Sequence, residues 1–379
     1  MLAHFVHHVI TALPVPLSPF IRDEFSLSNA RTLLIQSVFS WSYAVAQIPA
    51  GWLADRIGTR ILLIVGISGL AVAGILIGIS QTYVMLLAFM VLMGILGGGY
   101  HPSAAPMVSA AVSPADRGRA LGFHEIGASA SFLVAPMVAA GIATAWNWRV
   151  SYISISIPIL VFGIVIAGYL NRGTKASGTG TDLSGAYGDA ARPKSNYLRL
   201  VMFLLLSIFT GGVVGSITAL VPLYVVDAFQ SSEFAGSVYF TVFASTGLWA
   251  SPLGGYISDR LGRVPLIITL CVMSGAGVFL MRIAPSGVGI GAVMLLLGIT
   301  TFMRMPVSEA YIIGETTERN RSFVYGFYYS TMTGTGAVFA PIMGYISERY
   351  TYASAFTWAS IAIIAMTLFC AFFLRGSRN

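Results

Sequence analysis

Apolar side chains follow one another along this chain in long runs that only short polar breaks interrupt. A helix needs about 20 apolar residues to cross the hydrocarbon core of a bilayer, and these runs approach or exceed that length. The pattern predicts an all-α polytopic membrane protein with twelve transmembrane helices. The predicted spans are 2–21, 32–53, 61–80, 83–112, 120–143, 150–170, 198–226, 234–257, 264–284, 287–313, 323–346 and 353–374.

One polar stretch, from Asn171 to Asn196, is much longer than the other breaks and is rich in Gly, Ser, Thr and Ala. This composition is typical of a flexible linker. It divides the predicted spans six and six. We therefore expect an N-terminal six-helix bundle over residues 1–170, a linker over 171–196 and a C-terminal six-helix bundle over 197–379.

The two halves repeat one another at a constant shift of 204 residues. Two parallel six-helix halves related by an axis along the membrane normal are a known construction of secondary transporters, with the substrate site near the midplane between them. The repeat therefore predicts a pseudo-symmetric transporter that alternates access by rocking one bundle against the other. Matching positions include Asp23 and Asp227, Gly51 and Gly255, Asp55 and Asp259, Gly94 and Gly298, and Pro102 and Pro306.

Composition narrows the class further, because 56% of the 379 residues are hydrophobic and only 9% are charged. Soluble domains carry about 25% charged residues. Soluble enzymes and free nucleic-acid binders are thereby excluded. The net charge of +7 is informative only through the loops that carry it.

The cations collect in alternate loops, as the positive-inside rule describes for the cytoplasmic side of a membrane. We therefore expect these loops and both termini to be cytoplasmic, in a protein of the cell inner membrane. The cations concerned are Arg56, Arg60, Arg117, Arg119, those of the linker, Arg260, Arg263, Arg319, Arg321, Arg375 and Arg378.

The segment GWLADRIGTR, from Gly51 to Arg60, combines a glycine with a carboxylate and two cations at the cytoplasmic surface. It resembles the signature loop between spans two and three of the major facilitator superfamily, and the segment from Gly255 to Arg263 resembles its second copy. The resemblance implies a latch that closes the cytoplasmic side. The residues implied in gating are Gly51, Asp55, Arg56, Gly58, Arg60, Asp259 and Arg260.

Within that superfamily, the sequence LMGILGGGYHP of the fourth span and HFVHH of the first are similar to those of the fosmidomycin-resistance group of drug exporters. This resemblance implies efflux of a drug or metabolite. The group tends to carry an acidic residue in the first span where this chain has His8.

Ionisable residues inside the spans are candidates for chemistry, because Arg, Lys or Asp at a helix centre costs about 2.5–3.5 kcal/mol on insertion scales. We take Glu125 and Glu309 as candidates for carrying a coupling proton, with a fixed ion pair as the alternative for Glu125. His8, His101 and His124 are further candidates, since imidazole titrates near physiological pH. His4 and His8 share a helix face, but no acid or cysteine lies at ligand spacing beside them, so no metal site is predicted.

Arg304 is the main candidate for binding substrate, because its rigid fork of donors suits a carboxylate or a phosphate. The alternative is a structural partner, either Glu125 or a helix carbonyl. Tyr100, His101 and Tyr328 are the other substrate-binding candidates, and packing is the alternative for the tyrosines.

These features predict a monomeric secondary active transporter for a small organic solute, with protons and the lipid bilayer as its other partners and no cofactor. No nucleotide-binding loop is visible, so a proton gradient is the expected drive. Efflux would depend on Glu125 or Glu309, whereas uptake of a small organic anion would depend on Arg304. A non-transporting membrane sensor is the alternative of another class, and an enzyme is not predicted because no nucleophile is paired with a base.

Overall fold

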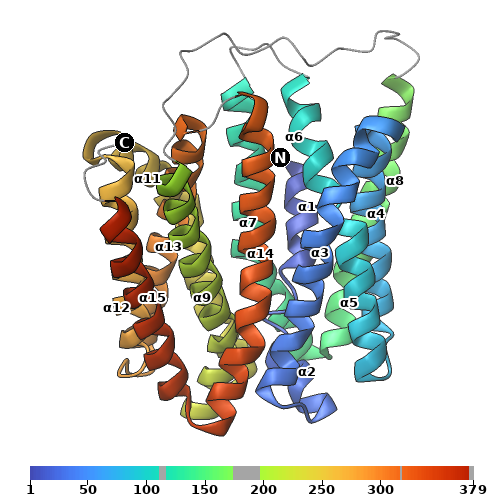
Figure 1. Cartoon of the computed structure of the whole chain (residues 1–379). Helices are drawn as coiled ribbons and strands as arrows, with labels where there is room; N and C mark the ends of the chain where they lie inside the picture. Colours follow the sequence, from blue (N-terminus) through green and yellow to red (C-terminus); the bar gives the residue numbers. More distant parts are fainter. Residues whose placement is uncertain (111–116, 174–196, 316–317, 375–379) are drawn as a thin grey trace.

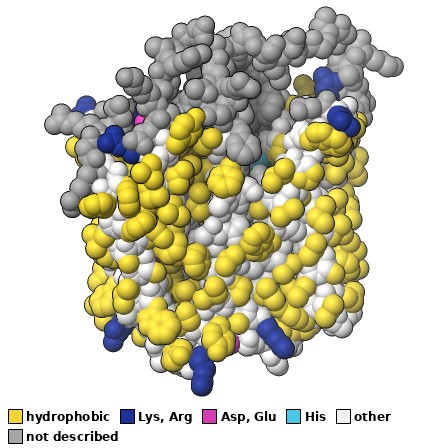
Figure 2. Space-filling model, in the orientation of Figure 1, with side chains coloured by type: hydrophobic (Ala, Val, Ile, Leu, Met, Phe, Trp, Pro, Cys, Tyr) yellow, Lys and Arg dark blue, Asp and Glu magenta, His cyan; other side chains and the backbone are white. Residues whose placement is uncertain are grey.

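The computed structural model describes residues 1–110, 117–173, 197–315 and 318–374, and these residues form helices and short connections without a strand. The helices lie side by side along one common direction (Figure 1). In the space-filling view, hydrophobic side chains cover the flank of the bundle, while Lys and Arg lie at its two ends (Figure 2). The all-α polytopic architecture predicted from the sequence is confirmed.

Two of the predicted spans in the first half are each divided into two helices. The first span turns over residues 12–17, which contain Pro14 and Pro16, and the fourth is interrupted at Gly98 and Gly99. Proline removes a backbone donor and glycine weakens a helix, so both breaks have a local cause. The helices are α1 (Leu2–Thr11), α2 (Ser18–Phe25), α3 (Asn29–Ile57), α4 (Thr59–Gly78), α5 (Tyr83–Gly97), α6 (Tyr100–Ala110), α7 (Arg117–Ala145) and α8 (Trp148–Gly173).

The second half has one divided span, where a short 3-10 turn (Thr246–Leu248) separates α10 from α11. Its helices are α9 (Tyr197–Phe229), α10 (Glu233–Ser245), α11 (Ala250–Leu261), α12 (Arg263–Leu280), α13 (Val288–Glu315), α14 (Glu318–Arg349) and α15 (Tyr352–Leu374).

Eight helical segments among the described residues are long and apolar enough to cross a membrane. The four other predicted spans correspond to α1 with α2, to α3, to α10 with α11, and to α14. Two of these are interrupted, and α3 and α14 are continuous but richer in polar residues. The eight segments are Thr59–Gly78, Tyr83–Ala104, Ile126–Ala145, Trp148–Leu170, Tyr197–Phe229, Arg263–Leu280, Val288–Ile312 and Tyr352–Leu374.

The repeat seen in the sequence is present in the backbone. Gly58 and Gly262, 204 positions apart, both adopt positive φ values, of 94° and 86°. These are left-handed conformations that favour glycine. Ser26 and Gln230, also 204 apart, have φ values of 50° and 51° and lie just before the starts of α3 and α10. Equivalent positions of the repeat therefore adopt the same backbone conformation in both halves.

A second pair of glycines shows that the repeat extends to helix packing. A Cβ atom on Gly94 of α5 would lie 2.6 Å from the carbonyl oxygen of Phe39 in α3. A Cβ atom on Gly298 of α13 would meet the carbonyl oxygen of Phe243 in α10, the position that repeats Phe39. Only glycine lets these helix backbones approach so closely.

The buried apolar side chains form one cluster within the first half, between Ile10 and Ile159, and another within the second half, between Leu200 and Leu374. A third cluster belongs to the second half except for Leu33 of α3. The halves meet where α3 packs against α14 and α7 against α10. The ribbons of α3 and α14 are close together near α2 and diverge toward the opposite end (Figure 1).

Candidate functional site

A network of charged and polar side chains joins the two halves at the end of the bundle that carries α2, which we call the Arg22 end. The Nη1 atom of Arg22 donates to Oδ2 of Asp227 in α9 at 2.8 Å, and Nε donates to Oδ1 of Asp23 at 2.9 Å. The side chains of Arg22 and Asp227 are 13% and 33% exposed. This ion pair is therefore partly shielded from water, which strengthens it relative to a surface pair.

The start of α3 extends the same network toward α14 and α15. The backbone N–H of Asn29 donates to Glu348, and its Nδ2 donates to the hydroxyl of Tyr352 at 2.7 Å. The Tyr352 hydroxyl in turn donates to Oδ2 of Asp227 at 2.5 Å. Gly344 allows this contact, because a Cβ atom there would lie 2.9 Å from the Cα of Ala30.

A carboxyl group of α10 takes part in the same contact between the halves. Burial raises the pKa of Glu233 above its usual range, and the neighbouring carboxylate of Asp23 raises it further, while Arg22 acts in the opposite direction. Burial by itself would lower the pKa of Arg22, but hydrogen bonds to Asp23 and Asp227 outweigh burial and raise it. Arg22 thus stays charged, and Glu233 takes up a proton more readily than an exposed glutamate does.

The helix α2 is also fastened to the first half. Glu24 forms an ion pair with Arg149 and accepts from Nε1 of Trp148 at 2.5 Å. Arg149 further donates from Nη2 to the carbonyl oxygen of Ser80 at 2.8 Å. In the sequence, Asp23 and Asp227 marked only the repeat, and this site was not predicted. Two acids at matching positions of the repeat were the available signal.

At the opposite end, which we call the Gly58 end, both copies of the signature loop have the same form. The guanidinium carbon of Arg56 lies 3.8 Å from the centre of the Trp52 ring, and that of Arg260 lies 4.3 Å from the centre of the Tyr256 ring. Arg60 is exposed, and Gly51 approaches Pro102 of α6. The side chains of Asp55 and Asp259 lie outside the described residues.

All five histidines, from α1, α6 and α7, come together in one cluster. The ring of His4 stacks on that of His124 with centroids 4.1 Å apart, and Nε2 of His8 lies 3.0 Å from Nε2 of His4. The ring of His101 lies 5.4 Å from that of His4 and 5.5 Å from that of His8. The three histidine candidates from the sequence, His8, His101 and His124, are therefore neighbours.

The remaining histidine, His7, stacks on Tyr100 with centroids 4.1 Å apart, and its Nε2 lies 3.0 Å from the hydroxyl of Tyr43. Tyr100 is fully buried. In this conformation Tyr100 packs inside the first half, as in the packing alternative to a substrate-binding role.

Arg304 occupies the place in the second half that Tyr100 occupies in the first, since the two positions are 204 residues apart. Its side chain is 2% exposed. Its Nη1 donates to the carbonyl oxygen of Ser207 at 2.6 Å and to the Ser207 hydroxyl at 3.0 Å. Gly211, which repeats His7, makes room for it, because a Cβ atom there would lie 2.7 Å from Nη2.

The partner of Arg304 is thus a helix carbonyl with its hydroxyl, one of the two structural alternatives. No carboxylate lies within ion-pair distance of Arg304 among the side chains that the structure describes. The hydroxyl of Ser207 also lies 3.0 Å from that of Tyr328 and 2.8 Å from that of Ser308. Tyr328 therefore belongs to the buried network that surrounds Arg304.

Glu309, one helical turn and a residue beyond Arg304 on α13, is partly buried and accepts a hydrogen bond from the hydroxyl of Tyr329 in α14. The side chains of Arg304 and Glu309 form no ion pair with each other, as their five-residue spacing predicts. The side chain of Glu125 lies outside the described residues.

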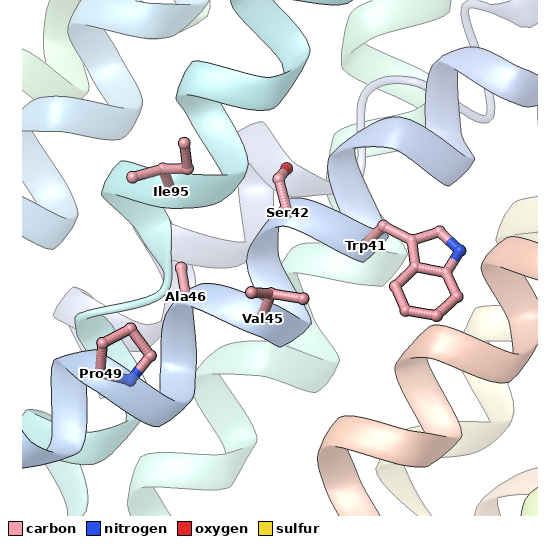
Figure 3. A pocket seen from close by; sticks show the side chains of 6 residues that line it. All are labelled: Trp41, Ser42, Val45, Ala46, Pro49 and Ile95. Carbon is pink, nitrogen blue, oxygen red and sulfur yellow. The ribbon is translucent and has the colours of Figure 1, made fainter.

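An apolar groove of about 430 Å³ lies on α3 and α5, close to the contact with α14 (Figure 3). Trp41, which projects at its edge, is 46% exposed and lies 3.9 Å from the place of a Cβ atom on Gly334. Such a groove suits an apolar chain or ring rather than a charged group. Its lining residues are Trp41, Ser42, Val45, Ala46, Pro49 and Ile95.

Comparisons with known proteins agree with this architecture. The family model of the Major Facilitator Superfamily matches residues 1–303 and 203–379. The multidrug resistance protein MdtG of Yersinia enterocolitica is 24% identical over 376 residues, covering 94% of this chain and 88% of that one. MdtG of Proteus mirabilis is 24% identical over 362 residues, covering 93% and 89%.

Solved structures with a similar fold are also transporters. A bacterial homologue of the human lysosomal transporter Spinster, in an inward-facing and occupied conformation, aligns with a TM-score of 0.75 at 16% identity, covering 98% of this chain and 94% of that one. A POT family transporter in complex with 5-aminolevulinic acid aligns with a TM-score of 0.78 at 13% identity over the same shares. The chain is therefore a multi-pass membrane transporter rather than an enzyme, and it belongs to the Major Facilitator Superfamily.

Proposed function

We propose that this transporter exports a small organic drug or metabolite in exchange for protons, as a monomer in the cell inner membrane. The curated relatives that cover more than nine-tenths of the chain carry the name of a multidrug resistance protein. The cations of the signature loops and of the linker favour a cytoplasmic Gly58 end with both termini on the same side. The Arg22 end then faces outward.

The moving parts of this proposal are the bundles 1–170 and 197–379, connected by the linker 171–196. The observation that carries it is the contact of Arg22 and Asn29 with Asp227, Tyr352 and Glu348, which joins the halves at the Arg22 end. A transporter whose outer end is closed in this way admits substrate from the cytoplasm, as an exporter requires. The signature loops, with Asp55 and Asp259, would close the Gly58 end in the other conformation.

We assign the coupling proton to Glu309. Its carboxylate lies inside a span and accepts from Tyr329, a bond that requires an ionised carboxylate or one whose proton lies on the other oxygen. Gaining a proton there would remove a charge from the interior and so favour rearrangement of α13 against α14. Glu125, next to the histidine cluster in sequence, is the second candidate.

The burial of Arg304 favours efflux over uptake of an anion. Anion uptake depends on Arg304 as a receptor for a carboxylate or phosphate, yet Ser207 already binds one of its nitrogens, and its side chain is 2% exposed. Of the substrate-binding candidates, His101 alone is partly exposed, whereas Tyr100 and Tyr328 are buried together with Arg304. We therefore place the substrate against the partly exposed side of His101.

Reconstituted vesicles test the proposal. A panel of drugs and organic anions is loaded, and flux is measured with and without a pH gradient for the wild type, Glu309→Gln and the control Glu315→Gln at the end of the same helix. Wild type and control should move a drug when the gradient is present, while Glu309→Gln should retain exchange of substrate for substrate but lose gradient-driven flux. Flux of anions only, gradient-driven flux in Glu309→Gln, or no flux of any compound would each contradict the proposal.

A further inference from the structure

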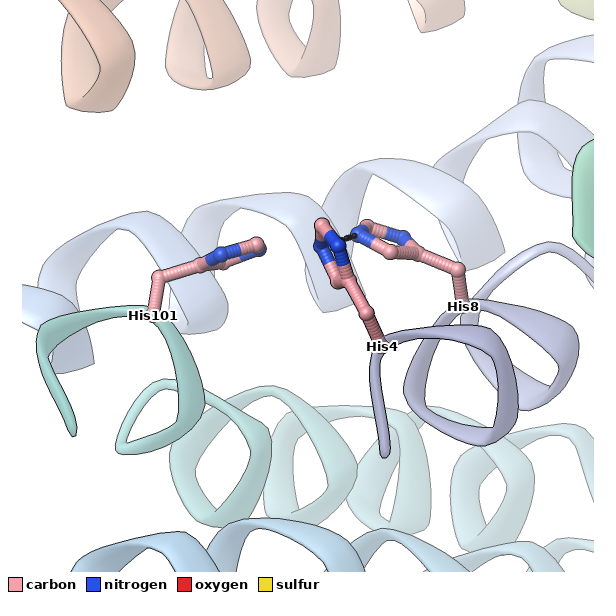
Figure 4. Close-up of side chains that lie close together, drawn as sticks. All are labelled: His4, His8 and His101. Carbon is pink, nitrogen blue, oxygen red and sulfur yellow. Dashed lines mark hydrogen bonds between the residues drawn. The ribbon is translucent and has the colours of Figure 1, made fainter. Parts of the chain in front are cut away.

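Three imidazoles of the histidine cluster converge on one point between α1 and α6. The ligand nitrogens of His4, His8 and His101 all lie within 4.8 Å of one another. In the close-up view the Nε2 atoms of His4 and His8 point toward each other, and the ring of His101 points toward them from the other helix (Figure 4). Three convergent imidazoles are the ligand set of a transition-metal site.

The hydrogen bonds of His4 show which of its nitrogens carries the hydrogen. Its Nδ1 lies 3.0 Å from the backbone carbonyl oxygen of His124. A carbonyl oxygen can only accept, so Nδ1 must carry the hydrogen and Nε2 presents a lone pair. Metal-binding histidines are usually oriented in this way, with the second ring nitrogen donating to a carbonyl or carboxylate.

His8 can adopt the same tautomer. The hydroxyl of Thr11 lies 3.3 Å from the carbonyl oxygen of His8 and 3.5 Å from its Nδ1. A hydroxyl that donates to the carbonyl can accept from Nδ1–H, which leaves Nε2 of His8 with its lone pair directed at His4. Without a metal, His8 keeps its hydrogen on Nε2 and donates it to His4. With a metal, that hydrogen is found on Nδ1, and no proton is lost.

The third ligand and the path of an ion follow from burial. His4 is buried, but His8 and His101 are partly exposed, so an ion can reach them without unfolding a helix. Zinc lies about 2.0–2.1 Å from imidazole nitrogen, which places the nitrogens of a tetrahedral site roughly 3.3 Å apart. Since the present separations are 3.0 Å for His4 and His8 and at most 4.8 Å for the set, a side-chain movement of roughly 1.5 Å by His101 completes the site.

We infer that His4, His8 and His101 bind one divalent transition-metal ion of the zinc class, with water as the fourth ligand. The other members of the cluster have different roles. The Nε2 of His7 faces the hydroxyl of Tyr43. His124 stacks its ring on that of His4, and its backbone carbonyl accepts from Nδ1 of His4. This site is independent of the proposed direction of transport and of its coupling ion.

A bound ion would link α1 to α6, the two short helices that adjoin the breaks in the first and fourth spans. An ion that binds the folded protein but not the unfolded chain stabilises the folded state. Once the ion concentration exceeds the dissociation constant, this stabilisation grows with the logarithm of the concentration. Zinc should therefore raise the melting temperature of the protein, and the increase should disappear when one of the three ligands is removed.

The test is direct binding to the full chain, purified without a polyhistidine tag, in lipid nanodiscs at pH 7.5. Zn²⁺ is titrated by calorimetry, and Co²⁺ is titrated as a spectroscopic probe of tetrahedral geometry. We expect one ion per chain and a visible absorption band with Co²⁺. His8→Gln and His101→Gln should each weaken binding at least 100-fold, while Thr11→Val, which leaves all three ligands in place, should weaken it about 10-fold to 100-fold.

His7→Gln is the matched control, because it removes a histidine of the same cluster that is not a ligand, and it should bind zinc as the wild type does. Equal affinity in wild type, His8→Gln and His101→Gln would overturn the inference, as would an equal loss in His7→Gln. If the glutamine variants do not purify as monodisperse protein, Thr11→Val decides the question, and wild-type affinity in that variant would overturn the inference. These measurements involve no transport, so they stand apart from the flux experiment.

Discussion

Replacing Asp227 with asparagine should shift the transporter away from the conformation that is closed at the Arg22 end. Oδ2 of Asp227 accepts hydrogen bonds from both Arg22 and Tyr352. Asparagine keeps the shape of the side chain but has no charge, and its amide group has only one accepting oxygen. Asp227→Asn therefore weakens the bonds that join α2 and α15 to α9 without leaving a cavity.

The size of the effect follows from the exposure of the pair. A hydrogen bond to a charged group contributes about 1.5–3 kcal/mol, whereas an exposed ion pair contributes about 0.2–1 kcal/mol. Since Asp227 is 33% exposed and Arg22 13% exposed, the lower end of the first range, about 1.5 kcal/mol, is appropriate. A difference of 1.4 kcal/mol is about tenfold in an equilibrium constant, so the ratio of open to closed molecules should rise about tenfold.

The assay measures distances between spin labels at the Arg22 end. Labels on cysteines at positions 31 and 349 report on the ends of α3 and α14, and both Arg31 and Arg349 are exposed. The native Cys271 and Cys370 are buried and are replaced by alanine. In Asp227→Asn the ratio of the longer-distance to the shorter-distance population should rise about tenfold over the labelled wild type.

Arg282→Gln is the control, since Arg282 is an exposed cation at the same end with no ion pair to another described residue. It should leave the distance distribution unchanged. An unchanged distribution in Asp227→Asn, or the same shift in the control, would refute the reasoning that the Arg22 network holds this end closed. The double variant Arg22→Gln with Asp227→Asn should shift the equilibrium by less than the sum of the single effects, because the two residues share one bond.

Three further outcomes follow from the structure. The pKa of Glu233 is raised in the closed conformation, so a proton on Glu233 favours closure. The contribution of Glu233 to the closed population should therefore be largest at low pH and decline as pH rises through the raised pKa. Glu233→Gln should remove this contribution in the same distance measurement. Gly94→Ala should lower stability by about 1–3 kcal/mol in thermal unfolding, because its Cβ would overlap a carbonyl oxygen of α3, whereas Gly291→Ala, with nothing within 4 Å, should not lower it. Arg304→Ala should lower stability by about 1–3 kcal/mol, since it leaves its buried serine partner with fewer hydrogen bonds, and an unchanged melting temperature would contradict the structural role.

Much of the architecture is determined by patterns that are local in the sequence. The lengths of the apolar runs predict helices that cross a bilayer, because lipid requires every backbone polar group to be bonded within its own segment. The shift of 204 residues predicts that both halves have the same turns, and Gly58 with Gly262 shows that they do. The division of the first span was not predicted, although Pro14 and Pro16 were the signal for it.

The candidate sites depended instead on contacts between distant segments. Nothing in the spacing of the histidines placed His101 beside His4 and His8, because their helices, α6 and α1, come together only in the folded bundle. In the same way, the partner of Arg304 is a serine on α9, and nothing in the spacing of α13 pointed to it. Periodicity determines which face a side chain occupies on its own helix, but not which helix lies opposite.

The contact at the Arg22 end shows this limit most clearly. The acids Asp23 and Asp227 are equivalent in the repeat and both bind Arg22, but Arg22 lies beside the first in sequence and reaches the second only across the boundary between the halves. A repeat in sequence describes each half separately. How the halves meet is decided by charge and packing at their common surface, which depend on distances in space rather than on spacing along the chain.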